Sequence, residues 1–219
     1  MQAKSNFQAV LFDWDGCLAD TLSIWLSSYR DLCHQRGLYP TDKQITDQFG
    51  EWDGCLKLGV TDIEQYREQL DQLTRKRMEL LGLYPGVKKT LAQINKSGLP
   101  MAIVTSSRAD KIRPTLKRHK IDHYFQVIVD MEMVTQRKPD PEPVNKALEL
   151  LRIAEKDKKK VIMVGDSPKD ILASRAAGVT SVLFFPPDHN LIYDKNEILV
   201  TQSDFVIDDF NQLEEIVRN

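Results

Sequence analysis

Two aspartates separated by a single residue follow the first apolar run of the chain. Asp13 and Asp15 come directly after residues 9–12, and Gly16 follows them. A carboxylate can attack phosphorus to form an aspartyl-phosphate, which divides one difficult displacement into two easier ones. A second carboxylate nearby can protonate a departing alkoxide and later remove a proton from water. The pair is therefore suited to phosphoryl transfer, with Asp13 as the nucleophile and Asp15 as the acid and base.

Polar side chains also follow three later apolar runs. They are a hydroxyl pair, a lysine and two more carboxylates: Thr105, Ser106, Lys138, Asp166 and Asp170. In a doubly wound sheet, ligands bind beyond the carboxyl ends of the strands, so such a fold brings these side chains to one rim. There Lys138 and the hydroxyl of Thr105 or Ser106 would hold the phosphoryl oxygens, whose charge matters most during transfer.

The carboxylates of this set need a cation. Asp13, Asp15 and Asp166 crowd like charges that cannot all ionise cheaply on their own. Oxygen ligands with room for water suit Mg²⁺ better than zinc or copper. We therefore expect Mg²⁺ as the cofactor.

Short apolar runs mark the strands that would position these groups. They span residues 9–12, 101–104, 127–129, 161–164, 181–185 and 205–207. Continuous rather than alternating apolar runs are typical of strands buried on both faces of a parallel sheet. Helical periodicity separates most of them, at residues 87–96, 144–151 and 171–177. This alternation predicts an α/β fold with a doubly wound parallel sheet.

One segment breaks the alternation. Between residues 19 and 84 no strand is expected, but amphipathic helices are predicted at 21–37 and 62–81, the second with Asp62 as its N-cap. A helical stretch of this length directly after the first strand indicates an inserted subdomain rather than a crossover. We therefore divide the chain into a core, residues 1–18 and 85–219, and a helical cap, residues 19–84.

The composition narrows the class of protein. The 219 residues carry 30 basic and 32 acidic side chains, a formal net charge of −2, which excludes a polycationic nucleic-acid wrapper and a polybasic membrane-surface protein. The three cysteines do not have the spacing of a disulfide framework, which favours a protein whose thiols stay reduced. No apolar run approaches the ~18 residues of a membrane span, and no signal-peptide pattern opens the sequence. We therefore expect a cytoplasmic protein. The strand-end residues described above, not the composition, predict that it acts on a small phosphorylated metabolite.

The four segments, in this order and with a helical block after the first, resemble the haloacid dehalogenase superfamily. The likeness is strongest to its capped phosphatase and phosphomutase branch, the phosphoglycolate phosphatase and β-phosphoglucomutase type, and it covers nearly the whole chain. The resemblance implies that Asp13 is the nucleophile and Asp15 the acid and base. It implies that Thr105 and Lys138 bind the phosphoryl group.

The same resemblance implies a magnesium site. The metal is expected on Asp13, Asp15 and Asp166, with Asp170 supporting the site. In the family the metal takes a backbone carbonyl at the position of Asp15.

Two residues depart from the family pattern. Cys17 stands where threonine is usual, and Trp14 stands where a small aliphatic residue is usual. Cys17 would weaken a hydroxyl contact or make the site sensitive to oxidation, whereas Trp14 is expected to pack on the face opposite Asp13. The second aspartate, Asp15, argues against a dehalogenase, because a departing halide needs no proton.

Simpler interpretations stand beside these assignments. Asp13 and Asp15 could form a turn or an N-cap, Lys138 could be a solvated surface lysine, and Asp170 could be a carboxylate that stabilises the first turn of a helix.

Structural roles account for several further positions as well as functional ones do, or better. Ser107 is expected to be the N-cap of a helix at 108–117 rather than a substrate ligand. Trp52 and Asp53 are candidates for substrate contacts, although a structural turn accounts for them equally well. Whether the connection 186–203 borders the site is left open.

Three functions fit these features. The leading hypothesis is an Mg²⁺-dependent phosphatase that acts on a small metabolite. A sugar phosphomutase differs in letting a sugar hydroxyl, not water, take the phosphoryl group. A non-catalytic phospho-aspartate switch also uses a strand-end aspartate, Mg²⁺, a hydroxyl and a lysine, but such a fold has no helical insertion after its first strand.

Overall fold

Six parallel strands form the central sheet of the computed structural model, which describes residues 6–49, 51 and 53–218. Their order across the sheet is β3-β2-β1-β4-β5-β6. In chain order they are β1 (Ala9–Phe12), β2 (Met101–Val104), β3 (Phe125–Val129), β4 (Val161–Gly165), β5 (Thr180–Phe184) and β6 (Phe205–Ile207). The predicted doubly wound parallel sheet is confirmed.

The register of the central strands positions the polar residues. Phe12 pairs with Ile103 of β2 on one side and with Val164 of β4 on the other. The three strands therefore end nearly level, and the residues that follow them emerge at the same edge of the sheet.

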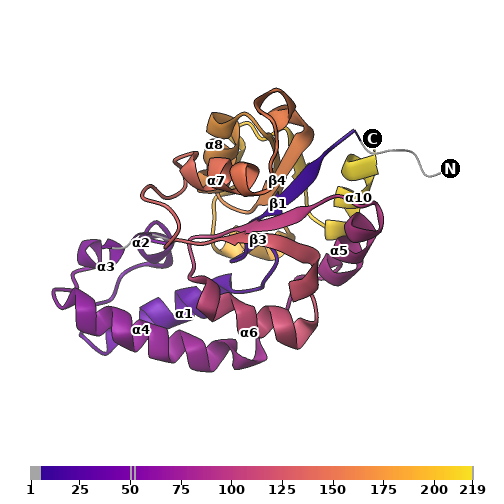
Figure 1. Ribbon diagram of the computed structural model, residues 1–219. Helices are drawn as coiled ribbons and strands as arrows, with labels where there is room; N and C mark the ends of the chain where they lie inside the picture. The colour runs from indigo at the N-terminus through magenta and orange to yellow at the C-terminus, as the bar shows by residue number, and fades with distance from the viewer. Residues whose placement is uncertain (1–5, 50, 52, 219) are drawn as a thin grey trace.

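Helices cover both faces of the sheet (Figure 1). Alternate strand residues such as Val10 and Phe12 pack with α5 (Val87–Lys96), α6 (Ala109–His119) and α10 (Phe210–Arg218). The intervening residues pack on the opposite face with α7 (Glu142–Leu150) and α8 (Pro168–Ala177). Both faces are thus buried, which is why these strands are continuously apolar.

The chain between β1 and α5 is helical. It forms α1 (Leu22–His34), α2 (Asp42–Thr46), α3 (Gly54–Lys57), α4 (Ile63–Arg77) and the 3₁₀ turn η1 (Met78–Leu80). These helices have a hydrophobic cluster of their own, which includes Leu26, Tyr29, Ile45, Tyr66 and Leu70. In Figure 1, α1 and α4 lie beneath the sheet beside α6.

The ends of this helical segment lie side by side. Ala19 forms an antiparallel bridge with Leu83, and the Tyr84 N–H donates to the carbonyl of Leu18. Asp62 occupies the N-cap position of α4, as predicted, but its side chain makes no capping hydrogen bond. It binds the Arg36 guanidinium instead.

Shorter elements complete the fold. The lysine-rich segment before β4 forms the 3₁₀ helix η3 (Glu155–Lys160), and η2 (Asp122–Tyr124) precedes β3. The connection between β5 and β6 contains η4 (Pro187–Leu191) and α9 (Lys195–Leu199). Among the described residues, no helix has the length and apolar character needed to cross a membrane.

Candidate active site

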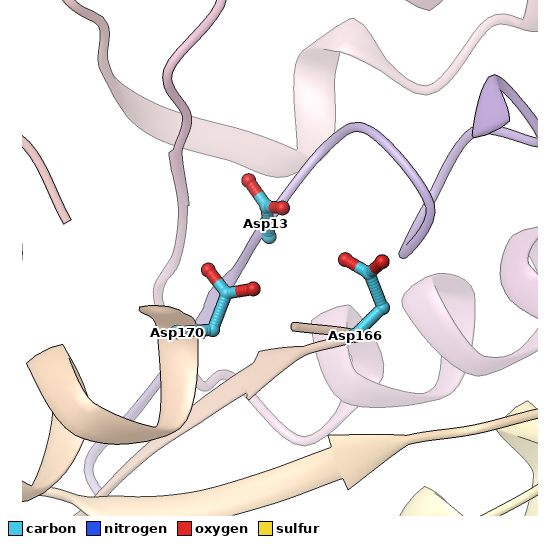
Figure 2. A group of neighbouring side chains, drawn as sticks. All are labelled: Asp13, Asp166 and Asp170. Carbon is cyan, nitrogen blue, oxygen red and sulfur yellow. The ribbon is translucent and has the colours of Figure 1, made fainter. Parts of the chain in front are cut away.

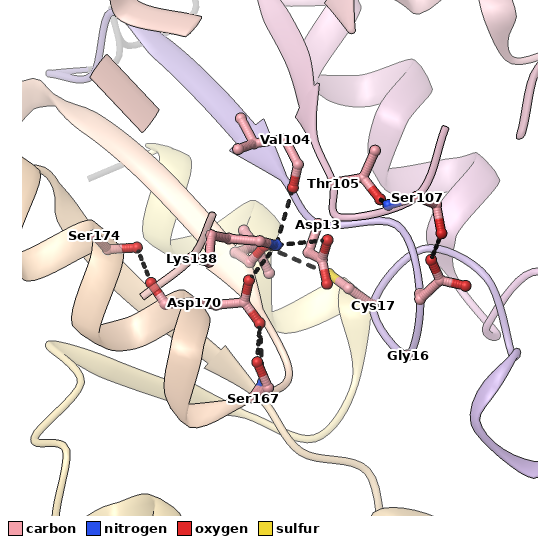
Figure 3. Close-up of polar contacts among 12 residues, drawn as sticks. Asp13, Gly16, Cys17, Val104, Thr105, Ser107, Lys138, Ser167, Asp170 and Ser174 are labelled. Atoms are coloured by element: carbon pink, nitrogen blue, oxygen red, sulfur yellow. Dashed lines mark hydrogen bonds and ion pairs between the residues drawn. The ribbon is translucent and has the colours of Figure 1, made fainter. Parts of the chain in front are cut away.

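Lys138 lies at the centre of the polar residues at the carboxyl edge of the sheet (Figure 3). Its ammonium donates hydrogen bonds to Asp13 Oδ1 at 2.8 Å, to Asp170 Oδ1 at 2.6 Å and to the Val104 carbonyl at 3.1 Å. The Lys138 side chain is only 5% exposed, so these three acceptors replace water around a buried cation. A solvated surface lysine is therefore excluded.

Three aspartates converge beside this ammonium. Carboxylate oxygens of Asp13, Asp166 and Asp170 lie within 4.8 Å of one another, and Figure 2 shows the three carboxyl groups around a common space. Asp166 Oδ2 is buried and has no hydrogen-bond partner. When all three carboxylates are ionised, one ammonium leaves two negative charges unbalanced, which is the charge that one divalent cation neutralises.

Burial and mutual repulsion shift the pKa values of these groups. Burial raises the pKa of Asp13 to about 7, although the charge of Lys138 acts in the opposite direction. Burial and the charges of Asp170 and Asp13 raise the pKa of Asp166 well above its usual value. Burial acts to lower the pKa of Lys138, but the charges of Asp13 and Asp170 outweigh it and raise that pKa. The lysine therefore stays a cation.

Gly16 allows the chain to pass close to Asp166. Its φ is +76°, in the left-handed region, and a Cβ atom there would lie 2.4 Å from Asp166 Oδ2. A side chain would therefore strain the backbone and also displace the carboxylate. This explains a glycine directly after the two aspartates.

Asp15 lies apart from the three clustered carboxylates and is held at both oxygens. Oδ1 accepts a hydrogen bond from Trp25 Nε1 at 2.9 Å, and Oδ2 accepts one from Ser107 Oγ at 2.6 Å. Trp25 belongs to α1 and Ser107 follows β2, so the helical segment and the core together fix the orientation of this carboxylate.

The prediction that Ser107 caps a helix is wrong. Helix α6 begins at Ala109 with Arg108 at the N-cap, and the Ala109 N–H donates to Asp130 Oδ2 at 2.8 Å. Asp130, far away in the sequence, accepts the hydrogen bond from the first N–H of α6. The Ser107 hydroxyl therefore binds Asp15 instead of capping the helix.

The two hydroxyls predicted to bind phosphate differ in position. Ser106 lines the cleft described below and is half-buried. Thr105 is buried, and its Oγ1 accepts a hydrogen bond from the Ser107 N–H at 3.0 Å. Thr105 thus shapes the turn that presents Ser106 and Ser107.

Cys17 and Trp14, the two residues that depart from the family pattern, are both buried. The Cys17 thiol donates to the Val164 carbonyl at 3.6 Å, and burial with the charge of Asp13 raises its pKa well above the usual value. A buried, protonated thiol is a poor nucleophile, which argues against oxidation sensitivity. Trp14 packs in the same hydrophobic cluster as Phe12, on the face predicted for it.

A cleft of about 1120 Å³ lies over these groups, between the core and the helical segment. The predicted site residues that line it are Asp13, Asp15, Ser106, Lys138 and Asp166. Phe49, Glu51 and one face of α4 contribute from the helical segment. Asp53 is exposed and lies outside the cleft lining, and Trp52 falls outside the described residues.

A tyrosine that sequence reasoning missed also borders the site. Tyr193 lines the cleft, and burial with the charges of Asp166 and Asp170 raises its pKa well above its usual value, so its hydroxyl stays protonated. Its N–H donates to the carbonyl of His189, and the buried His189 ring shares a hydrogen bond of 2.9 Å with the Tyr84 hydroxyl. The connection 186–203 therefore reaches the site. No motif or spacing marks Tyr193 in the sequence.

Comparison with known proteins places the chain in a family. The sequence model of haloacid dehalogenase-like hydrolases matches residues 10–184, most of the chain. The chain belongs to this family. Among curated relatives, pyrophosphatase PpaX of Bacillus velezensis is 32% identical over 182 residues, which cover 78% of this chain and 79% of the relative.

One further curated relative and one crystal structure also resemble the chain. The phosphoglycolate phosphatase of Neisseria meningitidis is 29% identical over 200 residues, 82% of this chain and 81% of the relative. The crystal structure of β-phosphoglucomutase from Clostridium difficile has a TM-score of 0.80 and 21% identity, and the match covers 96% of this chain and 95% of that one. At this identity the structural likeness establishes the fold. The predicted family and phosphohydrolase class are confirmed.

Proposed function

We propose that this family member is an Mg²⁺-dependent phosphatase that hydrolyses a small phosphorylated metabolite through an aspartyl-phosphate on Asp13. The observation that carries the proposal is the position of the Asp13 carboxylate, which contacts Lys138 and opens onto the cleft. Asp15, held by two donors, lies one residue further along the same loop. A turn or N-cap role does not account for this arrangement.

The residues present fit a magnesium ion. The buried orphan oxygen of Asp166 and the two unbalanced charges of the cluster are the features that a hard divalent cation satisfies. Asp13, Asp166 and the backbone carbonyl of Asp15 would hold it, with Asp170 in support. Bound Mg²⁺ would keep the carboxylates ionised and neutralise charge on the phosphoryl oxygens.

The protein's own side chains then divide the reaction into two steps. The Asp13 carboxylate forms a bond to phosphorus while the bond to the leaving oxygen breaks, and Asp15 gives that oxygen a proton. Asp15 next takes a proton from water, the water oxygen attacks phosphorus, and Asp13 leaves as a carboxylate. Lys138, Ser106 and Thr105 would hold the phosphoryl oxygens.

We propose residues 19–84 as a cap that closes over this chemistry. Two ion pairs cross from the core to the helical segment, Lys169 to Glu51 and Lys111 to Asp71. Closure would exclude water during attack on the substrate. The two adjacent chain segments at residues 17–20 and 83–86 would act as the hinge.

The test is phosphate release from p-nitrophenyl phosphate with and without Mg²⁺, in wild type and in Asp13→Asn. We expect Mg²⁺-dependent release by wild type and a loss of at least about 10³-fold in the variant. Full activity in Asp13→Asn would overturn the assignment of the nucleophile. Isomerisation of a sugar 1-phosphate without phosphate release would instead identify a phosphomutase. A stable aspartyl-phosphate without turnover would identify a phospho-aspartate switch.

A further inference from the structure

The side chain of Tyr193 extends from a hydrophobic cluster to the three clustered carboxylates. Its ring packs against four buried residues of the core, Ile171, Leu183, Phe185 and Ile198. Its hydroxyl lies within hydrogen-bonding reach of the Asp166 carboxylate, and the charges of Asp13 and Asp170 also act on it. Tyr193 and Asp166 line the same cleft. One end of the tyrosine is therefore fixed by packing, and the other faces a carboxylate that we propose as a metal ligand.

The backbone around Tyr193 is held on both sides. The Tyr193 N–H donates to the His189 carbonyl at 2.8 Å, which closes a turn before the tyrosine. After it, Asp194 Oδ1 accepts a hydrogen bond from the Asn196 N–H at 2.8 Å and begins α9. The position of the tyrosine is thus determined by the chain on either side of it.

His189 anchors that turn in the core. Its ring is 1% exposed, and Nε2 shares a hydrogen bond of 2.9 Å with the Tyr84 hydroxyl. The ring also packs edge-on against Phe184, which ends β5, and against Phe185, which follows it. A side chain carried on a segment fixed in this way is preorganised, because little freedom is lost when its contact forms.

Asp166 differs from the other two clustered carboxylates in how it is held. The Lys138 ammonium has three protons to donate. Asp13, Asp170 and the Val104 carbonyl accept hydrogen bonds from it. The buried Oδ2 of Asp166 has no hydrogen-bond partner. The lysine that orients the other two carboxylates therefore does not orient this one.

A phenol hydroxyl can supply that orientation. When it donates to a metal-binding carboxylate, it restricts the rotation of the carboxylate and leaves the negative charge in place. A carboxylate held in this way presents its remaining lone pairs to the cation in a fixed direction.

We propose that Tyr193 is a positioning residue of the metal site, whose hydroxyl orients Asp166 for binding Mg²⁺. The proposal rests on the proposed function, since it concerns the metal of that same site. It gives the connection 186–203 a role in the chemistry that neither the strand ends nor the helical segment provides.

The experiment measures Mg²⁺ affinity by calorimetry in wild type and in Tyr193→Phe, which requires no turnover. Phenylalanine keeps the ring that packs in the core and removes only the hydroxyl. Tyr29→Phe is the matched control, because Tyr29 also lines the cleft but belongs to α1. Circular dichroism and thermal unfolding without Mg²⁺ check that each variant is folded.

We expect Tyr193→Phe to weaken Mg²⁺ binding about 10- to 100-fold, the effect of removing a hydrogen-bond partner of a metal ligand. Added Mg²⁺ should therefore raise its melting temperature less than that of wild type. Hydrolysis of p-nitrophenyl phosphate should fall at low Mg²⁺ and recover in large part at saturating Mg²⁺, with KM for the ester unchanged. Tyr29→Phe should change the Mg²⁺ affinity less than about twofold.

The outcomes distinguish this proposal from the proposed function. Equal Mg²⁺ affinity in wild type and Tyr193→Phe would overturn the positioning role and leave the metal site standing. The same loss in Tyr29→Phe, or a raised KM at saturating Mg²⁺ with unchanged metal affinity, would also overturn it. Absence of Mg²⁺ binding by wild type would refute the metal site itself, and the positioning role with it.

Discussion

Ser107 Oγ lies 2.6 Å from Asp15 Oδ2 and donates a hydrogen bond to it. The opposite oxygen of the same carboxylate accepts from Trp25 in α1. A carboxylate with both oxygens engaged has little rotational freedom, so the proton of the acid and base proposed at Asp15 can be directed at one place. That carboxylate is held at both oxygens only when α1 is seated against the core.

Loss of either donor should therefore slow proton transfer. For Trp25→Phe and Ser107→Ala we expect kcat to fall about 10- to 100-fold with an alkyl phosphate, whose alkoxide must be protonated. The fall should be smaller with p-nitrophenyl phosphate, whose leaving group needs no acid. Steady-state kinetics on both substrates measures the contrast, and equal losses on the two would remove Asp15 from the acid role.

Magnesium affinity should depend on pH in the range where Asp13 titrates. The pKa of Asp13 is raised to about 7, so the metal-free protein holds a proton there that bound Mg²⁺ must displace. From the Asp13 proton, affinity should rise about fivefold between pH 6 and pH 7 and level off above about pH 8. Calorimetry in two buffers of different ionisation enthalpy counts the protons released. A pH-independent affinity with no proton release would contradict the site.

His189 should make the fold sensitive to acid. Burial lowers its pKa from 6.5 to about 4, so between these values the unfolded chain binds more protons than the folded chain. Stability therefore falls as pH falls through this window. Between pH 7 and pH 5, the free energy of unfolding of wild type should drop about 2 kcal/mol more than that of His189→Gln. Urea unfolding at both pH values tests this, and parallel pH dependence in the two proteins would refute it.

Gly16→Ala should disturb the metal site as well as the backbone. Gly37 supplies the matched control, because its φ is +71° but nothing lies within 4 Å of a Cβ placed there. Both substitutions should destabilise the fold by about 1–2 kcal/mol through backbone strain. Only Gly16→Ala should also abolish Mg²⁺ binding, since its methyl group displaces the Asp166 carboxylate. Retained binding in that variant would show that the carboxylate moves freely.

The strand-end residues could be predicted because the apolar runs stop where the sheet stops. The structure brings Asp13, Asp166 and Lys138 together at this rim, because the edge of a parallel sheet gathers the residues that follow its strands by topology alone. The contacts of Asp15 could not be predicted. They depend on how α1 packs against the core and on Asp130 taking over the start of α6.

The position of Tyr193 beside the site could not be predicted from the sequence for a similar reason. Its position depends on His189 and Tyr84, which lie far apart in the sequence and meet only in the folded chain. A polar connection with two prolines carries no periodicity from which such a contact could be read.

The two carboxylate oxygens of Asp170 contact different parts of the structure. Oδ2 accepts hydrogen bonds from the N–H and hydroxyl of Ser167 and so begins α8, whereas Oδ1 binds Lys138. The start of a core helix and the candidate active site are therefore linked through one carboxylate. Amide protons in the first turn of α8 should exchange with solvent at a rate governed by the occupancy of the site, which makes this helix a natural reporter of ligand binding.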